Sequence, residues 1–194
     1  MMTQNTYFLT VVSGLPRSGT SLMMQMIAAG GVEPVTDHER EPDVDNPHGY
    51  LEFERVKQIK TDQGWLPESM GKSVKMIHAL LEPLPDNHEY RVVFMRRNLD
   101  EILASQSKML ERQGKSGANL PPAVLKKVFQ DQLDKTLAML ESRPNFTVHE
   151  VWYHEIVSDP QTHAEAVDAF LGGGMDIEAM VGAVDPKLYR NKST

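Results

Sequence analysis

The chain of 194 residues contains no cysteine, which excludes disulfides and thiolate metal sites and fits a reducing compartment. It has no excess of basic residues either, because its formal net charge is −7, whereas proteins that coat nucleic acid are strongly basic. The apolar run Tyr7–Val12 is too short to cross a membrane, and no basic segment precedes it. We therefore expect a cytoplasmic protein that binds neither nucleic acid nor membrane, although a few arginines can still form a local nucleotide pocket.

The composition is that of an ordinary globular protein, and the order of predicted strands and helices is that of an α/β fold. Hydrophobic residues make up 40% and charged residues 24%, and the length suits one domain over residues 1–194. The strand patterns are Tyr7–Ser13, Ser73–Ile77, Tyr90–Met95 and Phe146–Tyr153. The helical patterns are Thr20–Ala29, Gly49–Lys60, Asn98–Gln113, a long helix opened by Pro121 and Pro122, and Pro160–Leu171. Because strands alternate with helices, we expect a three-layer α/β fold with a central parallel sheet.

Two polar segments interrupt this alternation of strands and helices. Residues 32–49 are rich in proline and in charged side chains, and residues 114–121 contain Gly114 and Gly117. Connections of this length and composition are often functional. We expect both to be mobile loops that border the functional site.

The most specific motif lies between the first strand and the first helix. It reads Gly14-Leu15-Pro16-Arg17-Ser18-Gly19-Thr20-Ser21. At such a junction the backbone N–H groups of a helix N-terminus face one point, and the helix dipole favours an anion there. A simple tight turn would not require Pro-Arg-Ser-Gly-Thr, so we interpret the segment as an anion-binding loop.

This loop lacks the lysine of nucleotide kinases and ATPases. Thr20 stands where the pattern Gly-x4-Gly-Lys-Ser/Thr has its lysine, and the cation of the loop is Arg17 instead. A γ-phosphate normally comes with Mg²⁺ held partly by an acidic residue at another strand end. The strand Tyr90–Met95 ends in Arg96-Arg97, with no carboxylate at its tip. These features favour a ligand that has phosphates at both ends and no metal.

The loop resembles the 5′-phosphosulfate loop of the sulfotransferase family, in the variant with arginine in place of lysine. A second signature of that family is an arginine at a helix start followed eight positions later by a serine, and Arg97 and Ser105 match it. A weaker similarity is the stretch Val151–Pro160, which ends in Asp-Pro and is followed by Phe170-Leu171-Gly172. The resemblance spans most of the chain and implies the P-loop NTPase-like sulfotransferase fold.

The resemblance also implies a donor and a set of binding residues. The donor would be 3′-phosphoadenosine 5′-phosphosulfate (PAPS; product PAP), and the acceptor a hydroxyl or amine of a small molecule. The 5′-phosphosulfate would be held by Gly14, Pro16, Arg17, Ser18, Gly19, Thr20 and Ser21. Arg97 and Ser105 would grip the 3′-phosphate, and Arg17 would also stabilise the leaving phosphate oxygen. At its C-terminus the chain departs from the family pattern: Arg190 or Lys187 is available there as a further cofactor cation, with a solvated tail as the alternative.

The general base has several candidates. Glu52, in the sequence Gly-Tyr-Leu-Glu, resembles a glutamate of bacterial members and ranks first as the catalytic base. His78 ranks second. Lys75 and His78 resemble the lysine and histidine of other family members, but one more residue separates the two than in the family pattern. Asp37 and His38 are further candidates, and for each of the four a solvated polar residue is the plain alternative.

Two other functions remain open at this stage. A P-loop-type nucleotide-dependent kinase would need ATP and Mg²⁺ without the usual lysine. A non-catalytic nucleotide-binding module would keep the loop without a base. The residues predict no metal site. Exposed helix faces leave room for a homodimer, although no residue of the sequence specifies one.

Overall fold

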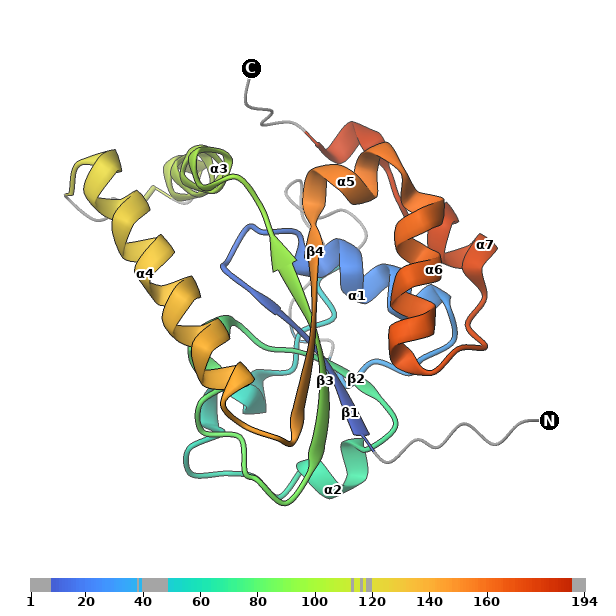
Figure 1. Cartoon of the computed structure of the whole chain (residues 1–194). Coiled ribbons are helices and arrows are strands. Elements are labelled where there is room, and N and C mark those ends of the chain that lie inside the picture. Colours follow the sequence, from blue (N-terminus) through green and yellow to red (C-terminus); the bar gives the residue numbers. More distant parts are fainter. Residues whose placement is uncertain are drawn as a thin grey trace.

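A four-stranded parallel sheet forms the centre of the protein (Figure 1). The computed structural model describes residues 8–37, 39, 49–112, 114–115, 117 and 120–189, without the side chain of Leu188. The strands are β1 Phe8–Gly14, β2 Ser73–Lys75, β3 Glu89–Arg96 and β4 Phe146–Trp152. They lie in the order β2-β1-β3-β4, and every neighbouring pair is parallel.

Helices cover both faces of the sheet. The α-helices are α1 Thr20–Ala29, α2 Leu66–Ser69, α3 Leu99–Arg112, α4 Pro122–Glu141, α5 Tyr153–Ser158, α6 Pro160–Leu171 and α7 Ile177–Gly182. Three short 3₁₀ helices are η1 Glu54–Gln58, η2 His78–Leu80 and η3 Pro186–Leu188. Figure 1 shows α3 and α4 on one side of the strands and α1, α5, α6 and α7 on the other.

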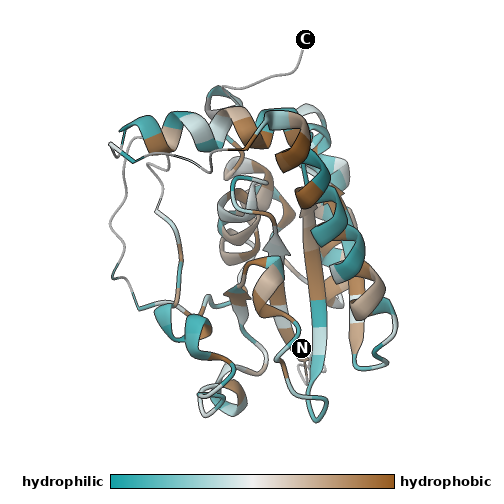
Figure 2. Cartoon of the chain, turned by 90° about the vertical axis from the view of Figure 1, so that its left-hand side faces the viewer, coloured by the Kyte–Doolittle hydropathy of each residue, from teal (hydrophilic) through white to brown (hydrophobic). Residues whose placement is uncertain are grey.

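The side chains of each strand alternate between the two faces of the sheet, and the hydrophobic core therefore forms two clusters, one on each face. Leu9 and Val11 of β1 pack into a cluster with residues of α3 and α4, whereas Val12 packs with residues of α1, α5, α6 and α7. Successive side chains of a strand point to opposite faces, so a strand buried on both faces is apolar throughout. Figure 2 accordingly shows hydrophobic colour along much of the strands and mixed colour along the helices. The predicted three-layer fold with a central parallel sheet is confirmed.

The helix expected over 49–60 is wrong for its first half. Residues 50–53 are not helical, and only the short η1 follows them. Leu51 has a positive φ of 48°, and the Asp37 carboxylate accepts a 2.6 Å hydrogen bond from the backbone N–H of Glu54. These tertiary constraints replace the helical path that the local sequence favours.

Most of the second half of the first predicted loop, and part of the second loop, lie outside the described residues. Residues 38, 40–48, 113, 116, 118 and 119 are not described. The described start of the first loop follows the edge of the sheet, where Pro34 bridges to Ser73. It therefore serves in part as an extension of the sheet beside β2.

The carboxyl ends of β1, β2 and β3 meet at one edge of the sheet. In the register of the pairs, Val12 lies opposite Lys75, and Gly14 lies opposite Met95. The loop after β1, the end of β2 and the residues after β3 are therefore neighbours. In open parallel sheets, ligands bind beyond this edge.

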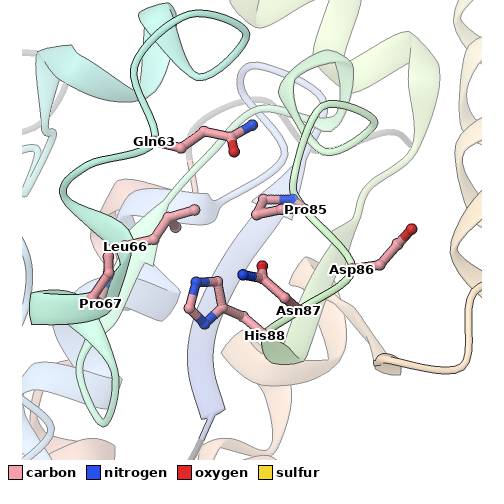
Figure 3. Close-up of a pocket in the computed structure, with 7 residues that line it drawn as sticks. All are labelled: Gln63, Leu66, Pro67, Pro85, Asp86, Asn87 and His88. Carbon is pink, nitrogen blue, oxygen red and sulfur yellow. The ribbon is translucent and has the colours of Figure 1, made fainter.

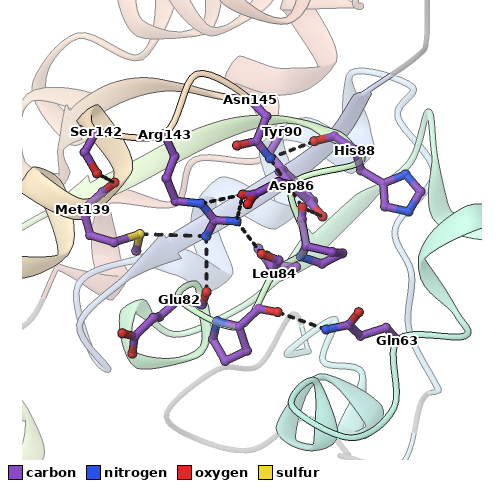
Figure 4. A network of polar contacts seen from close by, with 12 residues as sticks. Gln63, Glu82, Leu84, Asp86, His88, Tyr90, Met139, Ser142, Arg143 and Asn145 are labelled. Atoms are coloured by element: carbon purple, nitrogen blue, oxygen red, sulfur yellow. Dashed lines mark hydrogen bonds and ion pairs between the residues drawn. The ribbon is translucent and has the colours of Figure 1, made fainter.

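A polar network around Arg143 closes the opposite edge (Figure 4). Arg143 follows α4, and its guanidinium donates hydrogen bonds to the carbonyls of Glu82 and Leu84 and to the Asp86 carboxylate. It also lies 4.5 Å from the ring centroid of Phe146. This one side chain joins the loop before β3 to the turn before β4.

Replacing Arg143 should destabilise the fold more than replacing an exposed arginine. Arg143→Met leaves the carbonyls of Glu82 and Leu84 without their charged donor, and we expect a loss of about 2–3 kcal/mol in the free energy of unfolding. The control is Arg55→Met, because Arg55 pairs with Asp62 at half-exposed positions, where such pairs contribute about 0–1 kcal/mol. Urea unfolding of both variants measures the difference, and equal losses would contradict a structural role for Arg143.

Candidate functional site

A cavity of about 410 Å³ opens at the carboxyl edge of the sheet. Its walls come from the loop after β1, the segment around η1, the end of β2 with η2, and α3, with Tyr153 and Asp185 added. The predicted loop residues that line it are Pro16, Arg17, Gly19, Thr20 and Ser21. Gly14 and Ser18, the other two predicted loop residues, are buried beneath this surface.

The N-terminus of α1 faces this cavity. The helix begins at Thr20, which lines the cavity, and no side chain caps it. The first N–H groups of an α-helix have no partner within the helix, so an uncapped start is suited to an anion. The hydroxyl of Ser18 has no hydrogen-bond partner among the described residues, but it lies beneath the lining, where a Cβ on Gly14 would come within 2.6 Å of it. The backbone N–H groups at the start of α1 are therefore the donors that fit a phosphate or sulfate group.

Backbone strain is concentrated at two walls of the cavity. Among the described residues, Arg17 and Leu51 are the non-glycine residues with positive φ, at 72° and 48°. Such conformations cost about 1–3 kcal/mol each and persist where the surrounding structure enforces them. Arg17 lines the cavity directly, and Leu51 lies between Tyr50 and Glu52, which line it too.

Hydrogen bonds connect Arg17 with both Arg97 and Ser105, although Arg17 lies 80 or more positions before them in the sequence. The Nε of Arg17 donates a 2.9 Å hydrogen bond to Oγ of Ser105, and Nη1 of Arg97 donates one of 3.2 Å to the Arg17 carbonyl. The side chain of Arg97 is only 9% exposed and forms an ion pair with buried Glu101. Three cation or hydroxyl groups of the two sequence motifs thus meet at one end of the cavity.

At its other side, Lys75 bridges the loop to Glu52. Its Nζ lies 2.9 Å from Oε1 of Glu52, 3.0 Å from Oγ of Ser21 and 3.3 Å from the carbonyl oxygen of Tyr50. The side chains of Lys75 and Glu52 are 11% and 25% exposed. Sequence reasoning did not include Lys75 in the site, although its place at the end of a buried strand was a usable signal.

The other candidate bases lie in different surroundings. His78 is buried, and its Nε2 lies 3.3 Å from Oε1 of Gln132 on α4, so it contacts α4 and is not among the cavity-lining residues. The carboxylate of Asp37 accepts hydrogen bonds from the N–H groups of Glu39 and Glu54. His38 and Arg190 lie outside the described residues. Of the described candidates, Glu52 is the carboxylate that lines the cavity.

Apolar side chains also line the cavity. They include Phe53, Val56, Ile77, Leu80 and Met109. Glu54 and Lys57, which line the cavity too, pair with each other at 2.5 Å. The lining therefore combines cations that suit an anion with apolar side chains that suit an apolar body.

A second cavity, of about 470 Å³, lies at the opposite edge of the sheet (Figure 3). It is lined by Gln63, Leu66, Pro67, Pro85, Asp86, Asn87 and His88. Asp86 is paired with Arg143, and the side-chain amide of Gln63 donates to the Pro83 carbonyl. Its polar groups thus support the structure of the surrounding loops.

The described residues contain no cluster of three or more His, Cys, Asp or Glu side chains that could hold a metal ion. None of their helices combines the length and the apolar character needed to cross a membrane.

Comparison with known proteins gives a family match and a fold match. A model described as the sulfotransferase family matches residues 37–176, a range that begins after the loop and includes Glu52, Lys75, Arg97 and Ser105. The sulfotransferase domain from the Synechococcus PCC 7002 olefin synthase has a TM-score of 0.58 and 13% identity, over 95% of this chain and 80% of that one. The sulfotransferase domain from the curacin biosynthetic pathway has a TM-score of 0.53 and 15% identity, over 94% and 79%. No curated protein matches the chain in sequence.

A pair of glycine substitutions tests how tightly the loop is packed. Gly19 and Gly31 have nearly the same φ, 103° and 104°. A Cβ on Gly19 would lie 2.4 Å from the ring of Tyr153, whereas one on Gly31 would have no atom within 4 Å. Gly31→Ala should cost about 1–2 kcal/mol for its left-handed backbone, and Gly19→Ala about 1–3 kcal/mol more for the displaced ring. Urea unfolding measures both, and equal costs would mean that the Tyr153 ring moves freely.

Proposed function

The chain belongs to the sulfotransferase family, and we propose that it transfers a sulfuryl group from PAPS to a hydroxyl or amine of a small-molecule acceptor. The observation that best supports this proposal is the contact of Arg17 with both Arg97 and Ser105. These contacts join the two motifs that would bind the 5′-phosphosulfate and the 3′-phosphate, which one ribose carries. A bound donor supplies an activated sulfuryl group, which the acceptor takes by in-line displacement of the 5′-phosphate.

The loop residues would bind the 5′ end of the donor. The uncapped N–H groups at the start of α1 and the guanidinium of Arg17 provide hydrogen bonds and positive charge there. Arg97 and Ser105 would bind the 3′-phosphate, since both lie beside Arg17 at the same end of the cavity. A guanidinium suits this role because its planar fork of donors matches phosphate oxygens.

Lys75 is suited to stabilise the charge that develops on the leaving phosphate oxygen. Its ammonium group lies 3.0 Å from Oγ of Ser21, beside the start of α1. Preorganised donors at the site of charge development commonly contribute about 10²–10³ in rate. We therefore assign Lys75 and Arg17 to leaving-group stabilisation.

Glu52 is the general base of the proposal. The residue lines the cavity together with the loop and the apolar side chains, and Lys75 donates a hydrogen bond to one of its carboxylate oxygens. An acceptor that packs on the apolar side chains would bring its hydroxyl or amine to this carboxylate. A positioned base of this kind contributes about 10²–10⁴ in rate.

The position of Lys75 also argues against the kinase alternative. In P-loop kinases and ATPases, Mg²⁺ binds the loop Ser/Thr hydroxyl and an acidic side chain. Here the ammonium group of Lys75 lies between the Ser21 hydroxyl and the Glu52 carboxylate. A fixed positive charge already occupies the place that a magnesium ion would need, which favours a metal-independent reaction.

The transfer itself is tested with radiolabelled PAPS and a panel of phenols, aliphatic alcohols and amines in the presence of EDTA. We expect labelled product from at least one apolar acceptor, at a rate that added Mg²⁺ does not raise. Label transfer from ATP–Mg²⁺ instead would favour the kinase. Binding of PAP without transfer to any acceptor would favour a non-catalytic module.

Two variants then distinguish the candidate bases. Glu52→Gln keeps a hydrogen-bond acceptor for Lys75 but removes the base, so we expect kcat to fall by about 10²–10⁴ with little change in PAP affinity. His78→Gln serves as the control and should retain kcat, because its side chain contacts Gln132 on α4. The opposite pattern would transfer the role of base to His78.

A further inference from the structure

The end of the described chain folds back onto α3. After η3, the hydroxyl of Tyr189 donates a 2.9 Å hydrogen bond to Oε1 of Glu101, which lies 88 positions earlier. Asp185, just before η3, lines the cavity of the proposed donor site. The segment 185–189 therefore begins at the wall of that site and ends in contact with α3.

The carboxylate of Glu101 is shared between Tyr189 and Arg97. Glu101 is 4% exposed, and while Oε1 accepts from Tyr189, Oε2 accepts a 2.9 Å hydrogen bond from Nε of Arg97. A buried carboxylate is costly unless its oxygens are paired and hydrogen-bonded. Each partner thus determines where the carboxylate lies, and the carboxylate in turn orients Arg97.

The guanidinium of Arg97 also contacts two aromatic rings. Its Cζ lies 4.6 Å from the ring centroid of Tyr153 and 5.4 Å from that of Tyr189. The two rings are perpendicular, with centroids 5.1 Å apart. Such contacts favour a cation over each ring face. Tyr189 therefore acts on Arg97 both directly, through its ring, and indirectly, through Glu101.

We propose that Tyr189 is a positioning residue for the donor: it orients Arg97, through Glu101, toward the 3′-phosphate. The C-terminal segment then contributes to the preference for a nucleotide that carries a 3′-phosphate. This inference rests on the proposed function, because Arg97 has this role only if the cavity binds PAPS. Burial and the hydrogen bond to Glu101 raise the pKa of Tyr189 to about 12, so its hydroxyl keeps the proton that it donates near neutral pH.

The test compares the affinity for PAP with the affinity for 5′-AMP, which lacks the 3′-phosphate. In Tyr189→Phe the ring remains and the hydroxyl is lost, so we expect PAP affinity to fall about 3- to 10-fold while AMP affinity is kept. Tyr90→Phe is the matched control, because it removes a tyrosine hydroxyl that bonds the Pro85 carbonyl before β3, away from the cavity. Its ratio of PAP to AMP affinity should equal that of the wild type.

A double-mutant cycle with Arg97→Ala separates positioning from a general loss of stability. Arg97→Ala alone should weaken PAP binding about 10- to 150-fold, and Tyr189→Phe should add little in that background, because it acts through Arg97. An unchanged PAP to AMP ratio in Tyr189→Phe, or full additivity of the two changes, would overturn the inference. A wild-type protein that binds PAP no better than AMP would overturn the proposed donor site itself, and this inference with it.

Discussion

The ammonium group of Lys75 lies between the hydroxyl of Ser21 and the carboxylate of Glu52, and the chemistry of the cavity depends on this arrangement. A largely buried lysine is stable there because hydrogen bonds and an opposite charge compensate for its lost hydration. Its charge lies at the start of α1, where the helix already favours an anion. The same charge would repel a metal ion, which supports the proposed transfer without magnesium.

The proposed donor site depends equally on contacts between segments that are distant in the chain. Arg17 in the loop contacts Ser105 of α3 and the Arg97 side chain just before α3. Glu101, also on α3, connects Arg97 to the C-terminal segment through Tyr189. The strained backbone at Arg17 is held by these contacts. The loop, α3 and the end of the described chain are therefore joined by one set of contacts.

Local patterns in the sequence predicted the sheet and the loop, because these patterns reflect local physics. The β-branched apolar run before Gly14 needed no tertiary information, whereas the Arg97–Ser105 pair was identified from the resemblance to the sulfotransferase family. Sequence reasoning missed the role of Lys75, because the register of β2 against β1 brings it to Ser21, 54 positions away. It could not anticipate Tyr189 for the same reason, since that contact spans 88 positions. The extended path before η1 likewise depends on Leu51 and on contacts of Asp37, not on helix propensity.

The proposed function requires that the cavity binds a 3′,5′-bisphosphorylated nucleotide without a metal. Calorimetric titration of PAP into the wild-type protein, in EDTA and again in excess Mg²⁺, measures this binding, with ATP–Mg²⁺ as the competitor. We expect tight binding of PAP that is the same in both buffers and is not displaced by ATP–Mg²⁺. A preference for ATP that requires Mg²⁺, or no binding of PAP at all, would contradict the proposed function.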